Sequence, residues 1–271
     1  MAFSTHPAFA EPKSLDQVIW RYMDFTKFVS MLDRRSLYLR NLEALSRTGP
    51  FEGVLPKNFF EHRNWTTLNE VPDEERKRYS HSGPLSAEDK LATIKSSREA
   101  YAKTAWSTRK SIYVNCWHMS EHESHAMWSI YANKGSGIAI SSTFNRLESA
   151  LNLPEGRELY SGEIKYSDYN TDPNRFIPPN LFVNAMTKRR SFEFERELRV
   201  VFWDTSISHK VLPNGVQIDR EHEEIENLKV ADGVEIPCDL DTLIQNIYLY
   251  PAAEEWFHVT AHPAFKRRFP G

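Results

Sequence analysis

The apolar positions of the chain fall into short stretches that have either the spacing of strands or the spacing of helices. Residues 18–22 alternate apolar and polar side chains like a strand, and residues 25–32 repeat apolar side chains every three or four positions like a helix. Further strands are predicted at residues 36–40, 111–119, 138–140, 162–166, 198–203 and 246–250. Further helices are predicted at residues 124–132 and 147–151, from Pro178 and Pro179 to residue 190, and around Trp256. Because strands and helices are intermixed without a strict strand-helix-strand order, we expect an α+β fold with a mixed, mostly antiparallel sheet flanked by helices.

Residues 56–110 are richer in charged and polar side chains than the rest of the chain. Pro72 and Pro84 interrupt this region, and Ser86 with Asp89 forms a capping signal that starts a helix. A length of 271 residues favours one domain with an insertion over two equal domains. We therefore expect a single domain, residues 1–271, that carries a helical insertion at residues 56–110.

Charge and cysteine content exclude several classes of protein. With 34 Lys and Arg against 37 Asp and Glu, the net charge of −3 provides no overall field for nucleic acid or anionic membrane. Cys116 and Cys238 are too few for a disulfide framework. Residues 1–13 lack the pattern of a secretory signal, and no apolar run reaches the roughly 20 residues of a membrane-spanning helix. The sequence predicts a cytoplasmic protein with no membrane partner.

The segment from Lys188 to Arg199 contains three carboxylates and five cations in twelve residues, next to an apolar strand. If it is extended, its side chains alternate between an apolar face and a charged face that holds Glu193, Glu195, Glu197 and Arg199. Such a row of carboxylates suits a reaction in which positive charge develops on a sugar carbon, with Lys188 and Arg199 as the balancing cations. The alternative is a helical segment whose charges form only structural ion pairs.

A second group of candidate residues lies on the predicted helix at residues 124–132. Trp128 and Tyr131 are three positions apart, and they either belong to the core or line a pocket in which a planar ring stacks. His118, His122 and His125 do not predict a metal site, because His118 ends a strand and the spacing differs from that of zinc peptidases.

Motifs of several enzyme classes are missing from the sequence. The glycines at residues 135–137 are too few for a dinucleotide or nucleoside-triphosphate loop, and no G-x-S-x-G elbow occurs. Kinases, Rossmann enzymes and serine hydrolases of that type therefore have no support.

Several segments in a fixed order resemble a bacterial family of domains of unknown function, DUF2971. They are residues 37–39 with the Pro-Phe-Glu motif at 50–52, residues 127–132 with 137–140, the set Lys188, Phe192, Glu195, Glu197 and Arg199, and residues 243–248 with Pro251. The resemblance spans nearly the whole chain. It implies a setting in bacterial defence or abortive infection, as a toxin or an effector of the phage response.

The layout is also similar to that of ADP-ribosyltransferases. These enzymes have a late Glu-x-Glu pair, an early cationic residue that holds NAD and an aromatic residue that stacks on nicotinamide. The likeness implies that Glu197 is catalytic with Glu195 as its partner, that Arg21, next to Tyr22, anchors NAD, and that Tyr131 is the stacking residue. The alternative for Arg21 and Tyr22 is a structural pair on an edge strand.

Together these features predict an enzyme that consumes NAD as a substrate, with no further cofactor, and that transfers ADP-ribose to protein or nucleic acid or hydrolyses NAD. One alternative is a non-catalytic domain that binds phosphate or nucleic acid through cations such as Lys188 and Arg199. Another is a nuclease that holds a divalent metal on Glu193, Glu195 and Glu197.

Overall fold

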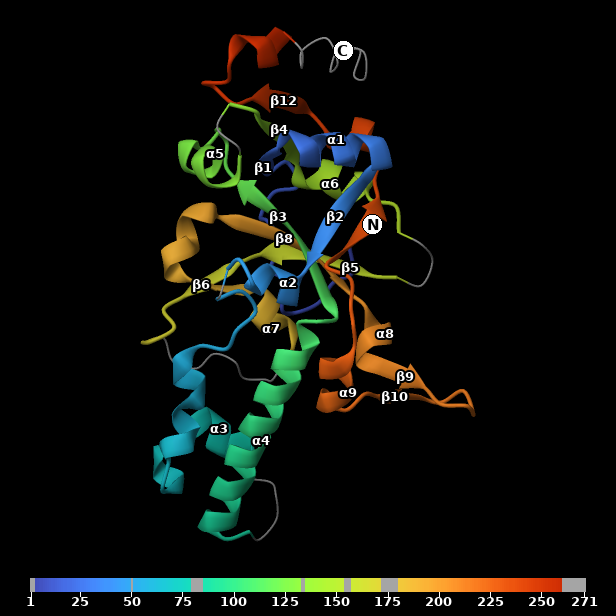
Figure 1. Cartoon of the computed structure of the whole chain (residues 1–271). Helices are drawn as coiled ribbons and strands as arrows, with labels where there is room; N and C mark the ends of the chain where they lie inside the picture. Colours follow the sequence, from blue (N-terminus) through green and yellow to red (C-terminus); the bar gives the residue numbers. More distant parts are fainter. Residues whose placement is uncertain are drawn as a thin grey trace.

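The computed structural model of the chain describes residues 3–49, 51–78, 85–132, 135–153, 157–171 and 180–259. Eight strands form one mostly antiparallel sheet, which confirms the predicted α+β fold class (Figure 1). These strands are β1 (Val18–Asp24), β2 (Ser36–Asn41), β3 (Ile112–Met119), β4 (Gly137–Thr143), β5 (Leu159–Glu163), β8 (Glu197–Trp203), β11 (Gly233–Pro237) and β12 (Asn246–Leu249). The order β11-β2-β3-β1-β4-β12 runs across the sheet, while β8 pairs with β3 and β5.

Two pairs of short strands lie outside this sheet. Parallel strands β6 (Lys165–Ser167) and β7 (Thr187–Arg189) form one pair, and antiparallel strands β9 (His209–Val211) and β10 (Gln217–Asp219) form the other. The α-helices are α1 (Phe25–Arg34), α2 (Leu42–Ser46), α3 (Asp73–Arg78), α4 (Ala87–Thr108), α5 (His125–Tyr131), α6 (Phe144–Ala150), α7 (Phe182–Ala185), α8 (Thr205–Ser208), α9 (His222–Asn227) and α10 (Leu240–Leu243). The 3₁₀ helices are η1 (Lys57–Asn64), η2 (Leu68–Glu70) and η3 (Arg190–Glu195).

Helices cover both faces of the sheet. On one face, α1, α6 and α10 contribute to a large apolar core that alternate residues of β1, β3 and β8 complete, among them Ile19, Trp117 and Leu198. On the other face, α2 and α7 pack against the remaining residues of β3 and β8, and α5 packs against β1 and β4. Successive residues of one strand therefore pack in different cores, because their side chains point to opposite faces of the sheet.

The change from strand to helix after β1 follows from local side-chain chemistry. Asp24 has the extended backbone of an N-cap, and its Oδ1 accepts the backbone N–H of Lys27 at 2.8 Å. This bond satisfies one of the N–H groups that the first turn of a helix leaves open. Phe28 and Met31 then lie on the buried side of α1, so the predicted amphipathic pattern at residues 25–32 forms the expected helix.

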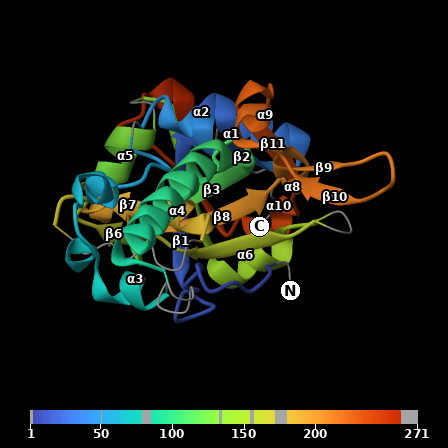
Figure 2. The same cartoon turned by 90° about the horizontal axis from the view of Figure 1, so that it is seen from below.

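The described part of residues 56–110 is helical and projects from the sheet as an arm of η1, η2, α3 and α4 (Figures 1 and 2). A buried ion pair holds the arm together, with Arg98 Nη2 at 2.7 Å from Glu75 Oε2 and both side chains less than a tenth exposed. His62 is fully buried and lies 2.9 Å from Glu99. Ser86 caps α4 as its sequence predicted.

The first two strands diverge where they meet β3. Ile19 and Trp20 of β1 pair with Met119 and His118 at one end of β3, and Arg40 and Asn41 of β2 pair with Val114 and Tyr113 at the other end. Residues 115–117 of β3 therefore face a fork between β1 and β2, while β8 pairs with their other edge.

Two expectations for the segment before β8 were wrong in part. Residues 190–195 form the 3₁₀ helix η3, so the extended alternative was wrong and the helical alternative holds as far as Glu195, and Phe192 and Phe194 do not continue the apolar face of β8. In the region where a helix to residue 190 was predicted, residues 182–185 form α7, but residues 187–189 form strand β7. The predicted start of that helix at Pro178 and Pro179 lies outside the described residues, as does Pro84.

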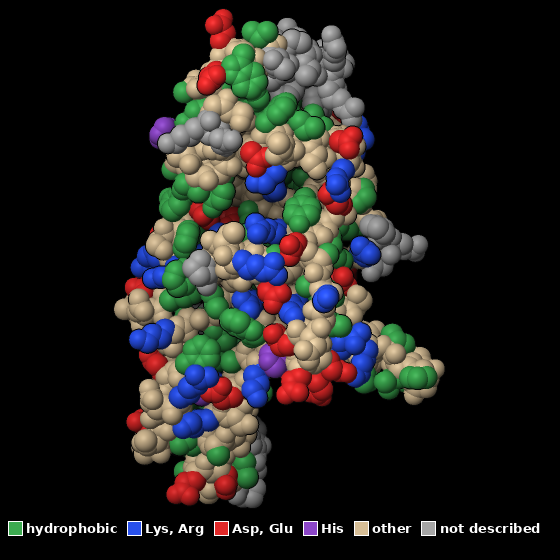
Figure 3. Space-filling view, in the orientation of Figure 1, with side chains coloured by type: hydrophobic (Ala, Val, Ile, Leu, Met, Phe, Trp, Pro, Cys, Tyr) green, Lys and Arg blue, Asp and Glu red, His purple; other side chains and the backbone are tan. Residues whose placement is uncertain are grey.

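The surface of the described residues carries both signs of charge. On the face seen in Figure 3, Lys and Arg side chains are interspersed with Asp and Glu. None of the helices within the described ranges is long and apolar enough to cross a lipid bilayer.

Candidate functional site

A buried cluster of charged side chains lies where β7, η3 and β8 meet. Its centre is Lys188, whose Nζ lies 2.7 Å from Glu52 Oε1, 2.6 Å from Glu195 Oε2 and 2.7 Å from Glu197 Oε2. Lys188 is only 6% exposed, so these contacts are shielded from solvent. One ammonium group therefore joins three carboxylates that come from three different elements.

Arg199, two residues after Glu197 on β8, completes the cluster. Its Nε donates to Glu197 Oε1 at 2.6 Å, and its Nη2 lies 3.1 Å from Glu52 Oε2. Its Nη1 donates to the carbonyl oxygen of Ala185 in α7 at 2.5 Å. Arg199 is fully buried, and its planar fork of donors suits it to join two carboxylates and a carbonyl.

The local backbone explains how these side chains meet. Glu197 and Arg199 are two residues apart on β8, so they share a face. Arg196 has a positive φ of 39° in a short turn between η3 and β8, which brings Glu195 back beside Glu197. Glu52 reaches the cluster from the loop after α2, where Gly53 has a φ of 66° and a Cβ would lie 2.8 Å from Leu42 Cδ2. A residue larger than glycine at 53 would disturb that approach.

Charge within the cluster is nearly balanced. Three carboxylates and two cations leave a formal charge of −1. Burial by itself would raise the pKa of Glu197, but the charges of Arg199 and Lys188 outweigh burial and hold that pKa well below its usual range. Burial would lower the pKa values of Lys188 and Arg199, but Glu197 and Glu52 raise both above their usual values. All three groups therefore stay ionised at neutral pH.

Uncharged polar groups surround the carboxylates. The hydroxyl of Tyr131 donates to Glu195 Oε1 at 2.5 Å, and the hydroxyl of Tyr166 accepts the backbone N–H of Glu197 at 2.8 Å. His118 Nδ1 lies 2.6 Å from the carbonyl oxygen of Glu195. Burial and the neighbouring Glu195 raise the pKa of Tyr131, so its phenol keeps its proton. The ring of Tyr131 is 42% exposed, so it connects solvent with the buried carboxylates.

Arg21 of β1 contacts Cys116, a residue of β3 whose thiol lies beside Glu197. Its Nη1 donates to the carbonyl oxygen of Cys116 at 3.1 Å, and its guanidinium lies 5.9 Å from the ring centre of Trp117. The thiol of Cys116 interacts with Glu197, and burial raises its pKa. By the alternation of β1, Arg21 shares a face with Ile19, opposite to the face of the cluster. The structure therefore places Arg21 near the carboxylates but not among them.

Tyr22 and Trp128 lie in the apolar core beside the cluster. Trp128 is 1% exposed, and its ring packs edge-on against Tyr22 and Tyr250. Its Nε1 donates to Glu123 Oε2, while the hydroxyl of Tyr22 accepts the backbone N–H of Ser124. With their rings covered and their polar tips satisfied, these two residues position α5 and offer no open face to a ligand.

Glu193 lies apart from the other two carboxylates of its segment. It is exposed on η3, whereas Glu195 and Glu197 are buried and paired with cations. Within the described ranges, no group of three His, Cys, Asp or Glu side chains is arranged to hold a metal ion. The expected row of three carboxylates on one strand face is thus wrong for Glu193.

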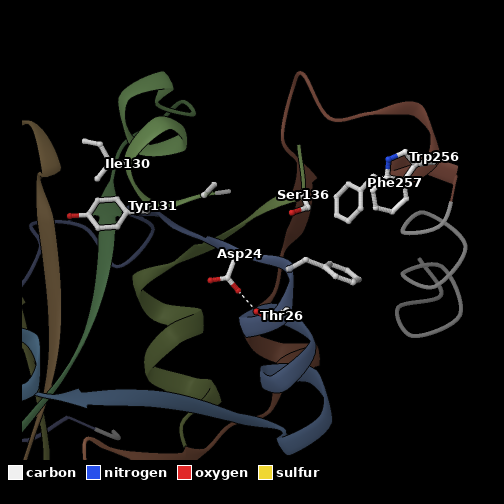
Figure 4. A pocket seen from close by; sticks show the side chains of 9 residues that line it. Asp24, Thr26, Ile130, Tyr131, Ser136, Trp256 and Phe257 are labelled. Atoms are coloured by element: carbon white, nitrogen blue, oxygen red, sulfur yellow. Dashed lines mark hydrogen bonds between the residues drawn. The ribbon is translucent and has the colours of Figure 1, made fainter. Parts of the chain in front are cut away.

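Tyr131 also borders a pocket of about 630 Å³ on the side away from its hydroxyl (Figure 4). The pocket lies between the start of α1, the end of α5 and a helical turn at residues 255–259. In Figure 4, Asp24 lies between Tyr131 on one side and Phe257 and Trp256 on the other. Its volume is in the range typical of small-molecule sites.

Sequence reasoning missed several residues of the cluster, above all Glu52. Glu52 belongs to the Pro-Phe-Glu motif that carried part of the family resemblance, so that motif was the available signal. Cys116, His118 and Tyr166 gave no comparable signal, because only the pairing of β3 with β8 and the position of β6 bring them to the carboxylates. The segments of the resemblance that hold Glu52, Tyr131 and Lys188 converge on this one site.

Comparison with known proteins assigns neither a family nor a function to the chain. No model of a protein family matches the chain, and neither a curated protein nor a solved structure is significantly similar to it. The resemblance to the DUF2971 family therefore stays a prediction from its motifs.

Proposed function

We propose that this chain is an enzyme that consumes NAD by breaking the bond between nicotinamide and ribose. The observation that carries the proposal is the buried, net-negative cluster whose outer carboxylate, Glu195, is joined to solvent by the half-exposed Tyr131. The acceptor of the ADP-ribose is water, a protein or a nucleic acid. By the family resemblance, the setting of this activity is bacterial defence or the action of a toxin.

The chemistry of the reaction matches this arrangement. When the bond from ribose C1′ to the pyridinium nitrogen breaks, its electron pair goes to that nitrogen and neutralises the ring. Positive charge develops on C1′, and a fixed carboxylate stabilises that charge. An oxygen of water or of an acceptor hydroxyl then bonds to C1′ and releases its proton.

The energetic cost of the cluster supports a functional use. Burying several charges requires desolvation, and apolar replacements of buried ion pairs are often equally stable or more stable. Strongly shifted pKa values such as those of Glu197 and Lys188 occur preferentially at functional sites. A net-negative cluster behind a half-exposed tyrosine is therefore better suited to stabilise a cationic transition state than to stabilise the fold.

The two central carboxylates take different roles in this proposal. Both oxygens of Glu197 are held by the cations Lys188 and Arg199, so Glu197 fixes the positions of its neighbours. One oxygen of Glu195 is held by Tyr131, whose hydroxyl can exchange with a ribose hydroxyl of the substrate. We therefore assign the reacting carboxylate to Glu195, where the likeness to ADP-ribosyltransferases had implied Glu197.

The alternatives have less support from the site. To bind phosphate, Lys188 and Arg199 would need donors that can turn toward it. Their donors are already directed at carboxylates. A metal-dependent nuclease would require Glu193 beside Glu195 and Glu197, and Glu193 lies on the exposed side of η3.

Nicotinamide release from NAD tests the proposal. The purified chain is incubated with NAD, alone and with mixed protein and nucleic-acid acceptors, and nicotinamide is quantified by chromatography. Glu195→Gln should reduce release at least about a hundredfold, the size typical of removing one group that stabilises transition-state charge. Glu193→Gln is the matched control in the same segment and should retain wild-type release. Absence of release from the wild type under every acceptor condition, or equal loss in the two variants, contradicts the proposal.

A further inference from the structure

A surface of basic and aromatic side chains lies on the outer side of the charged cluster. Strands β6 and β7 separate the two, because Tyr166 and Lys188 contact the cluster from one face of this strand pair. Lys165 and Arg189 belong to the opposite face, since side chains alternate along a strand. Lys165 is exposed and Arg189 is half-buried, so both cations face outward.

The third cation of this surface, Arg196, lies beside Lys165. The backbone N–H of Ile164 donates to the carbonyl oxygen of Glu197 at 2.9 Å, where the two segments run antiparallel. The next residues along these segments are Lys165 and Arg196, so their side chains start close together. Within the described ranges, neither of them nor Arg189 forms an ion pair with a carboxylate. Against these three cations, η3 exposes one carboxylate, Glu193.

Two phenylalanine rings are exposed among the cations. Phe194, on η3, is 45% exposed and lies two residues before Arg196. Phe51 is 43% exposed, and the guanidinium carbon of Arg189 lies 4.3 Å from the centre of its ring. Exposed aromatic side chains that gather beside unpaired cations indicate a binding surface more than a part of the core.

We propose that this surface, formed by Phe51, Lys165, Arg189, Phe194 and Arg196, binds single-stranded nucleic acid as the acceptor of ADP-ribose. Phosphates attract the cations, and unpaired bases stack on the exposed rings. A duplex hides the faces of its bases, and a row of carboxylates in an acidic peptide has no rings to stack, so neither uses both features. The chain has a net charge of −3, so a polyanion requires a local surface of this kind. The role of the strand as acceptor rests on the proposed function, whereas its binding does not.

The position of Glu195 connects this surface with the reaction. Phe194 and Arg196 flank Glu195, whose side chain points inward and accepts the hydroxyl of Tyr131. A strand that lies across the exposed rings therefore passes the proposed reacting carboxylate. An oxygen or nitrogen of the strand bonds to C1′ while the bond to nicotinamide breaks. The electron pair of that bond goes to the pyridinium nitrogen, and the acceptor atom releases its proton to solvent.

Binding of labelled oligonucleotides tests this inference without any bond cleavage. Fluorescence anisotropy is measured, in the absence of NAD, for single strands of DNA and of RNA of about 12 nucleotides and for the DNA duplex of the same sequence. At least one single strand should bind about tenfold or more tightly than the duplex, and the comparison of DNA with RNA identifies the sugar of the ligand. For three phosphate contacts, the logarithm of the association constant should fall with that of the salt concentration at a slope of about −2. No saturable binding of either strand, equal binding of the duplex, or equal displacement by a polyglutamate peptide would overturn the inference.

Two variants and two matched controls separate the contributions. Arg196→Gln removes one phosphate contact, so the salt slope should become shallower by about 0.7. Phe194→Ala should weaken binding about fivefold or more and leave the slope unchanged, because it removes a stacking ring and no charge. Lys103→Gln, at an exposed lysine of α4, and Trp256→Ala, at an exposed ring bonded to Glu254, should change neither quantity. A wild-type slope in Arg196→Gln, or equal losses in Phe194→Ala and Trp256→Ala, would also overturn the inference.

The two proposals fail in different ways. If a single strand binds as stated but NAD is never cleaved, the enzymatic proposal is wrong and the nucleic-acid surface stands. If NAD is cleaved but no strand binds, the nucleic-acid surface is wrong and the role of the cluster stands.

Discussion

Replacement of Lys188 by methionine isolates the energetic role of the buried cluster. Methionine is similar in length and uncharged, so the change removes the ammonium group that contacts Glu52, Glu195 and Glu197 at 2.6 to 2.7 Å. The formal charge of the cluster changes from −1 to −2, with Arg199 as its remaining cation. Removing one partner of a buried ion pair costs about 3–5 kcal/mol, a large part of the roughly 5–15 kcal/mol that stabilises a typical domain.

Urea unfolding followed by circular dichroism measures this loss. At about pH 7.5 the midpoint for Lys188→Met should fall well below that of the wild type. Without the ammonium group, three carboxylates share one cation, Arg199, and their mutual repulsion favours uptake of a proton by the folded protein. Part of the loss should therefore be regained as the pH falls toward about 5.

Two further variants act as controls for this prediction. Lys27→Met removes an ion pair with Asp24 in which Lys27 is 71% exposed, and it should cost less than about 1 kcal/mol. The double variant Lys188→Met with Glu195→Gln removes one of the unbalanced charges. Its loss in the free energy of unfolding should be smaller than the sum of the two single losses by about 1 kcal/mol or more. A Lys188→Met protein that unfolds within about 1 kcal/mol of the wild type contradicts a stabilising role for the Lys188 ammonium group.

Three other predictions follow from described contacts. Tyr131→Phe keeps the ring but loses the bond to Glu195, so nicotinamide release should fall more than tenfold while unfolding shifts by only about 1 kcal/mol, and wild-type release contradicts this role. Arg98→Leu leaves Glu75 buried without its partner, so limited proteolysis should cut the arm well before the main sheet, and an unchanged cleavage pattern contradicts the prediction. Burial lowers the pKa of His118, so its contribution to stability is present above its unfolded pKa of about 6.5 and is lost as the pH falls. His118→Gln should therefore flatten the pH dependence of unfolding between about pH 6.5 and 5, and an equal slope in both proteins contradicts this.

The sequence predicted the parts of the fold that local pattern determines. Residues 18–22 and 25–32 became β1 and α1 because alternating and helical apolar spacing each match one buried face. The capping signal at Ser86 marked the start of α4, and the apolar run at residues 198–203 marked β8. In these cases the local preference and the tertiary structure agree.

The segment before β8 could not be predicted in the same way. Phe192 to Glu195 alternates aromatic and acidic residues like a strand, yet the positive φ of Arg196 and the contact of Glu195 with Lys188 favour η3. Lys188 is held in turn by Glu52, which is distant along the chain. A pattern within a short window does not contain such a contact.

The candidate site was predicted in part for the same reason. Charge density pointed to Lys188, Glu195, Glu197 and Arg199, and all four belong to the cluster. Helical spacing, however, could not distinguish buried Trp128 from half-exposed Tyr131, because only packing against β1 and β4 decides which residue faces inward.

The rate of nicotinamide release from NAD by the wild type, Glu195→Gln and Glu193→Gln, measured side by side on folded protein, tests most directly whether the buried cluster acts on NAD. We expect release by the wild type and by Glu193→Gln, with loss confined to Glu195→Gln. No release by the wild type with any acceptor, or undiminished release by Glu195→Gln, would contradict it.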